Sequence, residues 1–255
     1  MEYSDANLKD LLWNTAHGMG ADAVGIANLE PVFPYIREEY GGFYTRWPRA
    51  VALAVYFPRE IVGQLRHGPT LEYNFYYHVL NRQLDSIAVA VSNLLTREGY
   101  SAYPIPSSQY RIAPPGQTKH LSGEKTGTEL KGSFSHKLAA SRAGLGWVGK
   151  SCQLISPEVG PWLRLVTVLT DAPLPAGCPL PNRCGTCTRC RDACPSRAIT
   201  GAAFRADAPL TERIDIDACI AHLRETGASF GKEVCNQCGL ACPWGRLDRT
   251  LAAKP

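Results

Sequence analysis

The sequence contains no long run of apolar residues. Its longest run, residues 50–57, is eight residues, whereas a helix needs about 20 to cross a membrane. Residues 1–17 also lack the apolar core of roughly 7–15 residues that a secretory signal requires. We therefore expect a cytoplasmic protein with no membrane partner.

The sequence also lacks a strong excess of charge of one sign. It has 27 Lys and Arg against 23 Asp and Glu, a net charge of +4. Nucleic-acid binding is usually marked by clustered Lys and Arg, and this balance is too weak to predict it alone. The apolar fraction of 45% is typical of a globular chain. A chain of 255 residues can form one large or two modest domains.

Cysteine is too scarce for a disulfide-stabilised scaffold, with 10 among 255 residues. Eight of the ten nevertheless follow one pattern, in which the second half of a repeat lies 48 residues after the first. The first half is a C-x2-C-x2-C-x3-C-P run, and the second half keeps all of it except the first cysteine. The eight cysteines are Cys184, Cys187, Cys190, Cys194, Cys219, Cys235, Cys238 and Cys242.

This run is typical of proteins that hold two iron–sulfur clusters, in which the fourth cysteine binds the other cluster. Lys232 stands where the repeat would put its missing cysteine, so Cys219 is the remaining donor. The predicted ligands of one 4Fe–4S cluster are Cys184, Cys187, Cys190 and Cys242. Those of the second are Cys194, Cys219, Cys235 and Cys238. A zinc ribbon is the alternative, although it rarely carries the third cysteine and the C-P ending.

Hydrophobic periodicity predicts helices and short buried strands along the chain. The expected helices cover about 8–16 (after a Ser4/Asp5 cap), 73–98 (ended by Gly99), 136–142 and 219–225 (capped by Asp217). The expected strands cover 21–27, 50–57, 101–105, 152–156 and 163–170. Residues 111–132 are expected to form a long loop. Cys152 is expected to pack within its strand, and Cys178 has no predicted role.

Residues 144–150 contain three glycines, Trp147 and Lys150. Glycines let a backbone approach a large ligand closely, and an indole offers a flat apolar wall. A tight connection between a helix and a strand explains the same residues equally well, and the pattern of a P-loop is absent. His78 and His136 lie in apolar surroundings, where a hydrogen-bonded core histidine is more common than a metal ligand.

Four blocks of this sequence together resemble the epoxyqueuosine reductase family, over roughly residues 70 to 246. They are Tyr77-His78, residues 143–150, residues 168–174 and the double cysteine motif that ends at Trp244. The resemblance implies an α+β protein with a nitroreductase-like cobalamin-binding domain (1–172) and a ferredoxin-like domain with two 4Fe–4S clusters (173–255). The cofactor contacts that follow are Tyr77, His78, His136, Gly144, Leu145, Gly146, Trp147, Gly149 and Lys150.

The family's activity is reduction of epoxyqueuosine in tRNA to queuosine, with electrons from an external low-potential donor. Glu129 stands nearest the place of the family's acidic residue, with Glu124 in reserve, and Ser151 stands where many members have His. The chain resembles a short branch without the family's C-terminal helical repeats. Phosphate contacts, or else a solvated surface, are expected at Arg111, Lys119, Lys125, Lys131 and Lys137.

Two other functions remain open on this sequence. One is an electron carrier or corrinoid-protein activator that has no substrate of its own. The other is an enzyme like the reductive dehalogenases, which resemble this family in pairing cobalamin with two clusters. Within the leading hypothesis, the substrate is either the tRNA or a smaller molecule.

Overall fold

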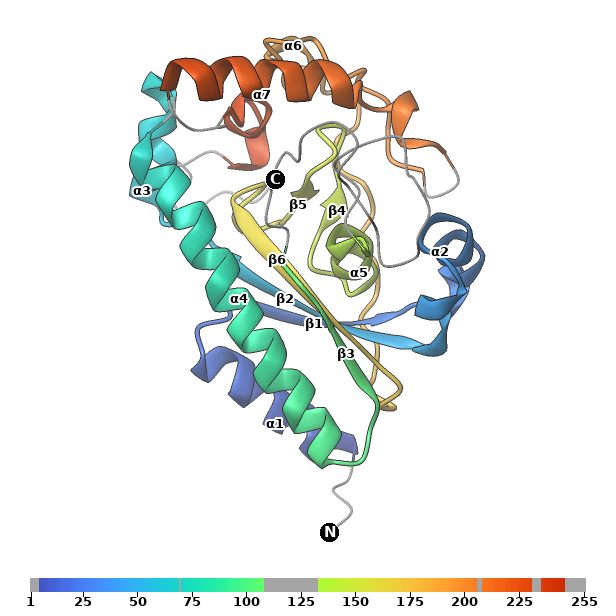
Figure 1. Cartoon of the computed structure of the whole chain (residues 1–255). Helices are drawn as coiled ribbons and strands as arrows, with labels where there is room; N and C mark the ends of the chain where they lie inside the picture. Colours follow the sequence, from blue (N-terminus) through green and yellow to red (C-terminus); the bar gives the residue numbers. More distant parts are fainter. Residues whose placement is uncertain (1–4, 69, 108–132, 206–207, 231–234, 246–255) are drawn as a thin grey trace. The chain divides into compact units, whose positions relative to one another are not determined.

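The computed structural model describes residues 5–68, 70–107, 133–205, 208–230 and 235–245 (Figure 1). The chain divides into two compact units, and each unit combines three separate segments. The first unit consists of Met1–Val55, Val79–Leu145 and Arg164–Leu180. The second consists of Tyr56–His78, Gly146–Leu163 and Pro181–Pro255.

A four-stranded sheet with the order β1-β2-β6-β3 is the centre of the first unit. Its strands are β1 (Ala23–Asn28), β2 (Arg49–Tyr56), β3 (Ala102–Ile105) and β6 (Leu163–Thr170). β1 runs antiparallel to β2, and β3 runs antiparallel to β6. Residues 50–55 of β2 are all buried. A strand covered on both faces needs apolar residues at every position, which explains this unbroken run.

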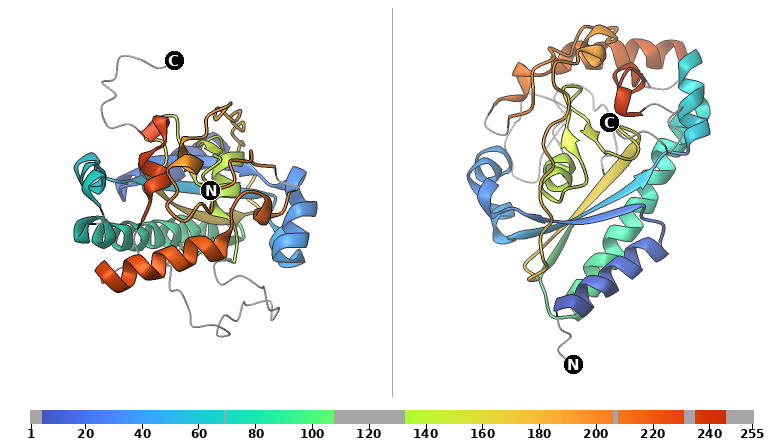
Figure 2. Two further views of the ribbon diagram at one scale, coloured as in Figure 1. Left: turned by 90° about the horizontal axis from the view of Figure 1, so that it is seen from above. Right: turned by 180° about the vertical axis from the view of Figure 1, so that it is seen from behind.

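The helices around this sheet are α1 (Asp5–Gly18), α4 (Leu71–Arg97) and α5 (His136–Arg142). The connection between β1 and β2 forms α2 (Phe33–Tyr40) and the short 3-10 helices η1 (Glu30–Val32) and η2 (Gly42–Arg46). α4 runs along one face of the sheet (Figures 1 and 2). It buries Leu84, Ile87 and Leu95 at helical spacing. Gly99, at a φ of 89°, takes the left-handed conformation that commonly ends a helix.

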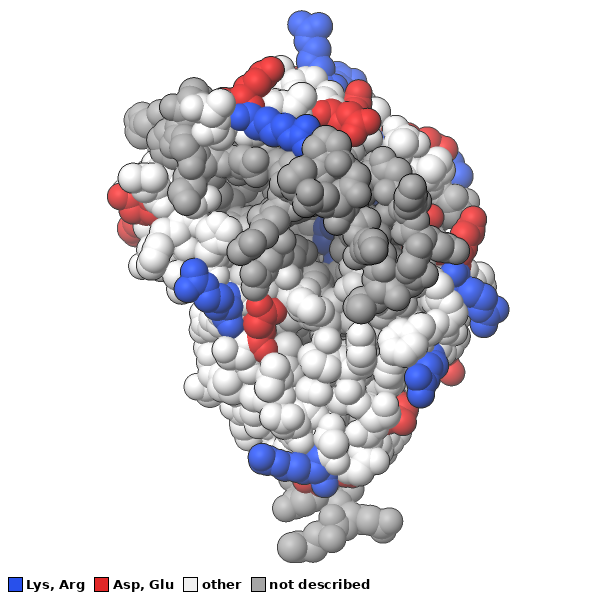
Figure 3. Space-filling model, in the orientation of Figure 1, with Lys and Arg blue, Asp and Glu red and all other residues white. Residues whose placement is uncertain are grey.

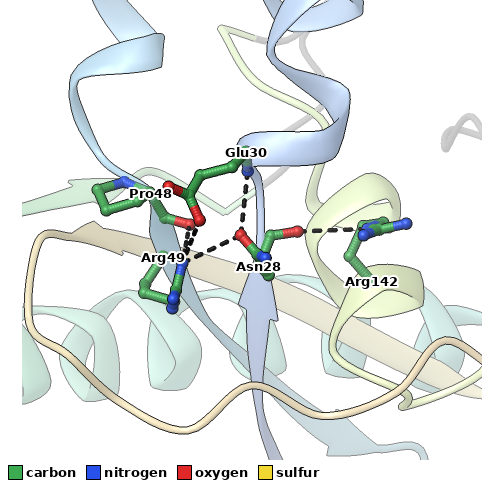
Figure 4. A network of polar contacts seen from close by, with 5 residues as sticks. All are labelled: Asn28, Glu30, Pro48, Arg49 and Arg142. Carbon is green, nitrogen blue, oxygen red and sulfur yellow. Dashed lines mark hydrogen bonds and ion pairs between the residues drawn. The ribbon is translucent and has the colours of Figure 1, made fainter.

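A polar network fixes the end of β1 against its neighbours (Figure 4). Asn28 Oδ1 accepts hydrogen bonds from the Glu30 backbone N–H at 3.1 Å and from Arg49 Nη1 at 3.0 Å. Arg49 Nη1 also donates to Glu30 Oε2 and to the Pro48 carbonyl. Arg142 Nε donates to the Asn28 carbonyl, which ties α5 to β1. Because α5 leads into the glycine-rich stretch, this network fixes where that stretch begins.

The second unit contains short elements and one longer helix. They are α3 (Arg59–Gln64), η3 (Leu65–His67), α6 (Arg189–Asp192), η4 (Leu210–Glu212), α7 (Ile216–Phe230), α8 (Gln237–Leu240) and η5 (Pro243–Gly245). A small hairpin of β4 (Trp147–Val148) and β5 (Leu154–Ile155) completes it. No helix in the described ranges is both long and apolar enough to cross a membrane.

The α+β class is confirmed, as are the predicted helices at α1, α4, α5 and α7 and four of the five strands. The strand expected at 152–156 is only two residues long, Leu154–Ile155. Cys152 lies in a turn outside it, at a φ of 60°, and donates its backbone N–H to the Gly149 carbonyl. The prediction that Cys152 packs within a strand is therefore wrong, although the side chain is buried.

Two further details differ from expectation. The predicted turn at 144–150 contains the strand β4, because Trp147 and Val148 pair with Ile155 and Leu154. The helix α7 is capped by Asp215 rather than Asp217, since Asp215 Oδ1 accepts the Ala218 backbone N–H at 3.0 Å. The loop predicted at 111–132 lies outside the described residues.

The compact units do not follow a single cut in the sequence. The predicted boundary between a cobalamin-binding domain (1–172) and a ferredoxin-like domain (173–255) remains a prediction. The two compact units are defined by packing instead. The hairpin of β4 and β5 belongs to the unit that contains the cysteines, and so does the chain from Tyr56 to His78. The reason lies in the hydrogen bonds that these segments make within the second unit, described next.

Candidate metal centre

Four cysteines of the second unit line one cavity of about 60 Å³. They are Cys184, Cys187 and Cys190, from the segment that includes α6, and Cys242, which directly precedes η5. The rest of the lining is Gly149, Lys150, Ser151, Ile155, Arg183, Pro243 and Trp244. Folding therefore brings the first half of the cysteine repeat to the last cysteine of the second half.

The thiols of this first group interact with one another. Burial raises the pKa of Cys190, and the charges of Cys184 and Cys187 raise it further. Burial also raises the pKa of Cys242 to about 11, with additional effects from Cys184 and Cys190. Mutual charge effects of this kind require the sulfur atoms to face a common space.

The other four cysteines form a second interacting group. Burial raises the pKa of Cys219, and nearby Cys194 and Cys235 raise it further. The pKa of Cys238 is also raised, first by burial and then by Cys235, Cys219, Cys194 and Cys190, the last of which lines the cavity of the first group. For Cys194, burial acts upward, but hydrogen bonds from Ser196 and from backbone N–H groups outweigh it and lower the pKa. The cavity brings together Cys184, Cys187, Cys190 and Cys242, and the assignment of the other four cysteines to a second cluster stays a prediction.

The donor chemistry of these groups fits iron–sulfur clusters. A buried thiol with a raised pKa stays protonated until a metal replaces its proton, so binding and proton release are coupled. Within the described ranges, no three His, Cys, Asp or Glu side chains lie close enough to hold a single metal ion. The four thiols of the first group line one cavity, as the ligands of a multi-iron cluster must do.

The connection between β4 and β5 contacts both groups of cysteines. Gly149 lies close to Cys184, since a Cβ there would touch Cys184 Sγ at 3.6 Å, and the same Cβ would clash with Ile155 Cγ1 at 2.7 Å. Lys150 Nζ donates to the Cys187 carbonyl at 3.2 Å. Further along, Cys152 acts electrostatically on Cys219, and Gln153 Oε1 lies 3.9 Å from Cys238 Sγ. We name residues 149–153 the cysteine-contact loop.

Sequence reasoning missed this loop as part of the metal centre. Residues 149–153 lie more than thirty positions ahead of Cys184, and only the hairpin brings them back to it. Gln153 has no neighbour in sequence that marks it as functional. The one available signal was Gly149-Lys150, which was predicted to contact a cofactor.

The glycines before the loop are explained by close packing of backbone. A Cβ at Gly146 would clash with the Ile155 carbonyl, so the hairpin requires glycine there. Gly144 has a φ of 82°, and a Cβ on it would lie 2.6 Å from the Cys178 carbonyl. The backbone of Cys178 thus has a packing role, while its side chain is exposed. These contacts support the structural alternative, a tight connection between a helix and a strand.

Three side chains form an aromatic and cationic cluster beside the cavity. The rings of Trp147 and Trp244 meet edge to face, with centroids 4.9 Å apart. The Arg183 guanidinium lies 6.0 Å from the Trp147 ring and 5.8 Å from the Trp244 ring. Trp147 Nε1 is buried and has no hydrogen-bond partner among the described residues. A buried N–H without an acceptor is costly, which makes this atom a candidate donor to a bound group.

The remaining predicted cofactor contacts lie in different surroundings. Tyr77 and His78 are half-buried on α4 within the second unit, with ring centroids 5.5 Å apart. Leu145 is the last residue of its segment in the first unit. The backbone N–H of Leu145 donates to the Ala140 carbonyl.

His136 lies in the core of the first unit, only 7% exposed. Its Nε2 lies 3.0 Å from the Pro106 carbonyl, which can only accept, so Nε2 carries the proton. Its Nδ1 therefore accepts from the Thr167 hydroxyl at 3.0 Å. Burial lowers the pKa of His136 to about 4. Both ring nitrogens are engaged, as expected of a core histidine.

The candidate acid lies outside the described residues. This applies to Glu129 and Glu124 and to four of the five loop cations, Arg111, Lys119, Lys125 and Lys131. Lys137, the fifth, is exposed on α5. On the face drawn in Figure 3, the described Lys and Arg side chains are scattered among Asp and Glu rather than gathered in one patch.

Comparison with known proteins agrees with this arrangement. Residues 183–245 match the family model described as a 4Fe-4S double cluster binding domain. The segment therefore is a double-cluster domain, and its bounds enclose all eight cysteines.

Solved structures share the fold. A crystal structure of epoxyqueuosine reductase with an epoxyqueuosine-modified tRNA stem loop matches with a TM-score of 0.58 and 20% identity, covering 95% of this chain and 66% of that one. A reductive dehalogenase, whose structure suggests a mechanism for B12-dependent dehalogenation, matches with a TM-score of 0.72 and 19% identity. That match covers 97% of this chain and 33% of the dehalogenase.

Curated relatives carry the same name as the first of these structures. Epoxyqueuosine reductase of Bacillus anthracis is 34% identical over 122 residues, 44% of this chain, and the match spans only 30% of that relative's length. Epoxyqueuosine reductase of Synechocystis is 30% identical over 246 residues, which cover 91% of this chain and 72% of the relative. The chain belongs to the epoxyqueuosine reductase family.

Proposed function

We propose that this chain is a reductase that passes electrons through two 4Fe–4S clusters to a bound cobalamin. The observation that carries the proposal is the cavity lined by Cys184, Cys187, Cys190 and Cys242, within a segment that matches a 4Fe-4S double cluster binding domain. When bound, the clusters would supply single electrons at low potential, and cobalamin would supply a reactive cobalt centre. The protein contributes thiolate ligands, close backbone contacts and the exclusion of water.

The ligand assignment follows from the two groups. We assign Cys184, Cys187, Cys190 and Cys242 to one cluster, because these four line one cavity. We assign Cys194, Cys219, Cys235 and Cys238 to the other, because these are the four that the crossed repeat leaves for it. Cys152 and Cys178 are left outside both sets.

The proposed cobalamin contacts are those that the family resemblance indicates. They are Tyr77, His78, Gly144, Leu145, Gly146, Trp147, Gly149 and Lys150. Two features support them: the unpaired Trp147 Nε1 and the B12-dependent reaction named for the dehalogenase of similar fold. We leave His136 out of this set, because both of its nitrogens already have partners in the core.

The proposed substrate is the epoxide of epoxyqueuosine in tRNA, and the proposed place of action is the cytoplasm. Family membership supports the reaction, and the related structure with a modified tRNA stem loop supports tRNA as the partner. Glu129 is the proposed acid that protonates the epoxide oxygen, which requires a pKa raised by burial near the substrate. An external donor of low potential would reduce the clusters.

Cobalamin binding is the experiment that tests the proposal. Protein reconstituted without oxygen should bind added cobalamin and convert it to the base-off form, seen in visible and EPR spectra. Cluster absorbance with an unchanged cobalamin spectrum would favour the second candidate, an electron carrier without its own substrate. That candidate rests on the cysteine groups alone.

The substrate is tested separately. With a strong reductant, the cobalamin-loaded protein should convert epoxyqueuosine-tRNA to queuosine-tRNA, detected by mass spectrometry. Glu129→Gln should lower the rate at least tenfold, within the range of general acid catalysis. Glu124→Gln is the matched control and should retain activity. Protein that binds cobalamin but forms no queuosine would point to a smaller substrate.

A further inference from the structure

A chain of polar side chains leads to the sulfur of Cys238. Tyr73, Gln153 and Asn236 come from three separate parts of the second unit: α4, the cysteine-contact loop and the residue before α8. Asn236 Nδ2 lies 2.8 Å from the Tyr73 hydroxyl, and Gln153 Nε2 lies 2.8 Å from Asn236 Oδ1. Cys238 Sγ lies 3.9 Å from Gln153 Oε1 and 4.0 Å from Asn236 Oδ1.

Two members of this hydrogen-bonded series, Tyr73 and Asn236, are held in place by their surroundings. Tyr73 is only 6% exposed, and its ring stacks on Phe57 with centroids 4.9 Å apart. Asn236 takes the left-handed conformation, with a φ of 59° and a ψ of 25°. Asn is among the few residues that adopt this conformation readily. A Cβ on Gly239 would lie 2.8 Å from Asn236 Oδ1, so this glycine leaves room for the Asn236 side chain.

The direction of these hydrogen bonds depends on the proton at Cys238. A protonated thiol has one hydrogen, which it can donate either to Gln153 Oε1 or to Asn236 Oδ1. A cysteine that ligates iron has lost its proton to solvent and can only accept. The amide oxygens would then face a thiolate, which is unfavourable.

Rotating both amides by half a turn reverses every bond without moving a heavy atom far. Asn and Gln oxygen and nitrogen positions differ little in shape, so the rotation needs no extra space. The Tyr73 hydroxyl then donates to Asn236 Oδ1, and Asn236 Nδ2 donates to Gln153 Oε1. Gln153 Nε2 and the second hydrogen of Asn236 Nδ2 face the Cys238 sulfur.

We infer that Gln153 and Asn236 donate amide hydrogens to the Cys238 sulfur in the cluster-loaded protein, with Tyr73 fixing their orientation. The donated bonds stabilise negative charge on sulfur, most of all in the reduced cluster, and so raise its reduction potential. The three residues are positioning residues for one cluster only. The inference rests on the proposed assignment of Cys238 as a cluster ligand.

Redox titration of the reconstituted protein, followed by EPR, tests the inference. Gln153→Leu should lower the potential of one of the two clusters by about 59 mV, the one-electron equivalent of a tenfold change in the equilibrium constant. Gln153→Glu should lower it further, because it adds a negative charge. Gln83→Leu is the matched control and should change neither potential, since Gln83 belongs to the first unit and its amide donates to the Met19 and Gly20 carbonyls.

Tyr73→Phe is the second variant, chosen because Tyr73 lies two side chains away from the sulfur. It should shift the same potential in the same direction by less. Pulsed EPR after exchange into D2O should show weaker coupling to exchangeable deuterons in Gln153→Leu than in the parent.

Three results would contradict either the inference or the proposed function. Full iron content with both potentials unchanged in Gln153→Leu and Tyr73→Phe would overturn the inference and leave the clusters in place. A raised potential would overturn it too, since it would mean that the amide oxygens face the sulfur. Parent protein without iron would instead refute the proposed function.

Discussion

Individual residues of the glycine-rich stretch are set by the atoms that face them. Gly144 needs the left-handed backbone conformation, whereas Gly146 and Gly149 need close contact with β5. These are different physical requirements, and the sequence alone does not distinguish them. We therefore expect substitution by alanine to have a different effect at each of these glycines.

Gly146→Ala should destabilise the protein by about 1–3 kcal/mol, because its Cβ would press on the Ile155 carbonyl and separate the hairpin strands. Thermal unfolding of the reconstituted protein, followed by circular dichroism, measures the loss. Gly42→Ala is the control, since a Cβ there meets nothing within 4 Å. Equal melting temperatures for the two variants would contradict the packing explanation.

His136 makes folding sensitive to acid. Its pKa is lowered by burial to about 4, against about 6.5 in an unfolded chain. Between these values the unfolded state binds the extra proton, so stability is complete above about pH 6.5 and falls as the pH falls toward 4. His136 should therefore cost the native state about 2 kcal/mol between pH 7 and pH 5.

His136→Gln tests this prediction, because Gln can donate to the Pro106 carbonyl and accept from Thr167 without taking up a proton. The variant should lose less stability than the parent between pH 7 and pH 5, as measured by urea unfolding at each pH. Parallel curves for the two proteins would show that His136 is not the group responsible.

At the scale of elements, α7 places Cys219 in the second cysteine group. Asp215 accepts the Ala218 backbone N–H and begins the helix one turn before this cysteine. Capping residues satisfy backbone N–H groups that the helix itself leaves unpaired. The start of α7 thus determines which way the Cys219 side chain points.

Asp215→Ala should cost about 1 kcal/mol of stability and weaken cluster retention, because the first turn of α7 loses its cap. Iron loss over time after chelator addition and the melting temperature measure the two effects. Asp217→Ala changes an exposed carboxylate in the same turn and should have a smaller effect on both. A larger effect from Asp217 would restore it as the capping residue.

The hairpin of β4 and β5 is the element that links the glycine-rich stretch to the cysteines. Its cysteine-contact loop provides Lys150 to the Cys187 backbone and Gln153 to the Asn236 side chain. Beyond the hairpin, Trp162 Nε1 donates to the carbonyl of Gly245, three residues after Cys242. A segment predicted to bind one cofactor is thus also part of the wall of the cluster site.

At the scale of the whole molecule, Cys242 from the second half of the cysteine repeat lines one cavity with Cys184, Cys187 and Cys190 from the first half. We propose that Cys194 joins Cys219, Cys235 and Cys238 in the same crossed way. On this assignment, neither half of the repeat completes a ligand set alone. Expressing the two halves of the repeat as separate chains should therefore remove both cluster sites, whereas replacing one cysteine should affect only the cluster that it ligates.

Cys219→Ala should lose about half of the iron if each cluster assembles independently. Iron and acid-labile sulfide, determined after oxygen-free reconstitution, measure the loss. Cys178→Ala is the matched control and should keep all of the iron, because Cys178 is exposed and belongs to neither group. Unchanged iron in Cys219→Ala would refute the ligand assignment.

The sequence by itself determined the features that depend on local spacing. The period of apolar residues predicted α1, α4 and α5, and the crossed repeat placed Cys242 with Cys184, Cys187 and Cys190, which line one cavity. These predictions succeed because helices and C-x2-C turns follow from neighbours a few residues apart. The α+β class came from the family resemblance.

Only the tertiary structure decided the contacts between distant segments. It brought Gln153 and Tyr73 to Cys238 through Asn236, moved the cap of α7 to Asp215 and placed Cys152 in a turn. It also grouped the β4–β5 hairpin with the cysteines rather than with the preceding helix. The physical reason is that side-chain hydrogen bonds and backbone packing select partners by position in space, which local periodicity does not encode.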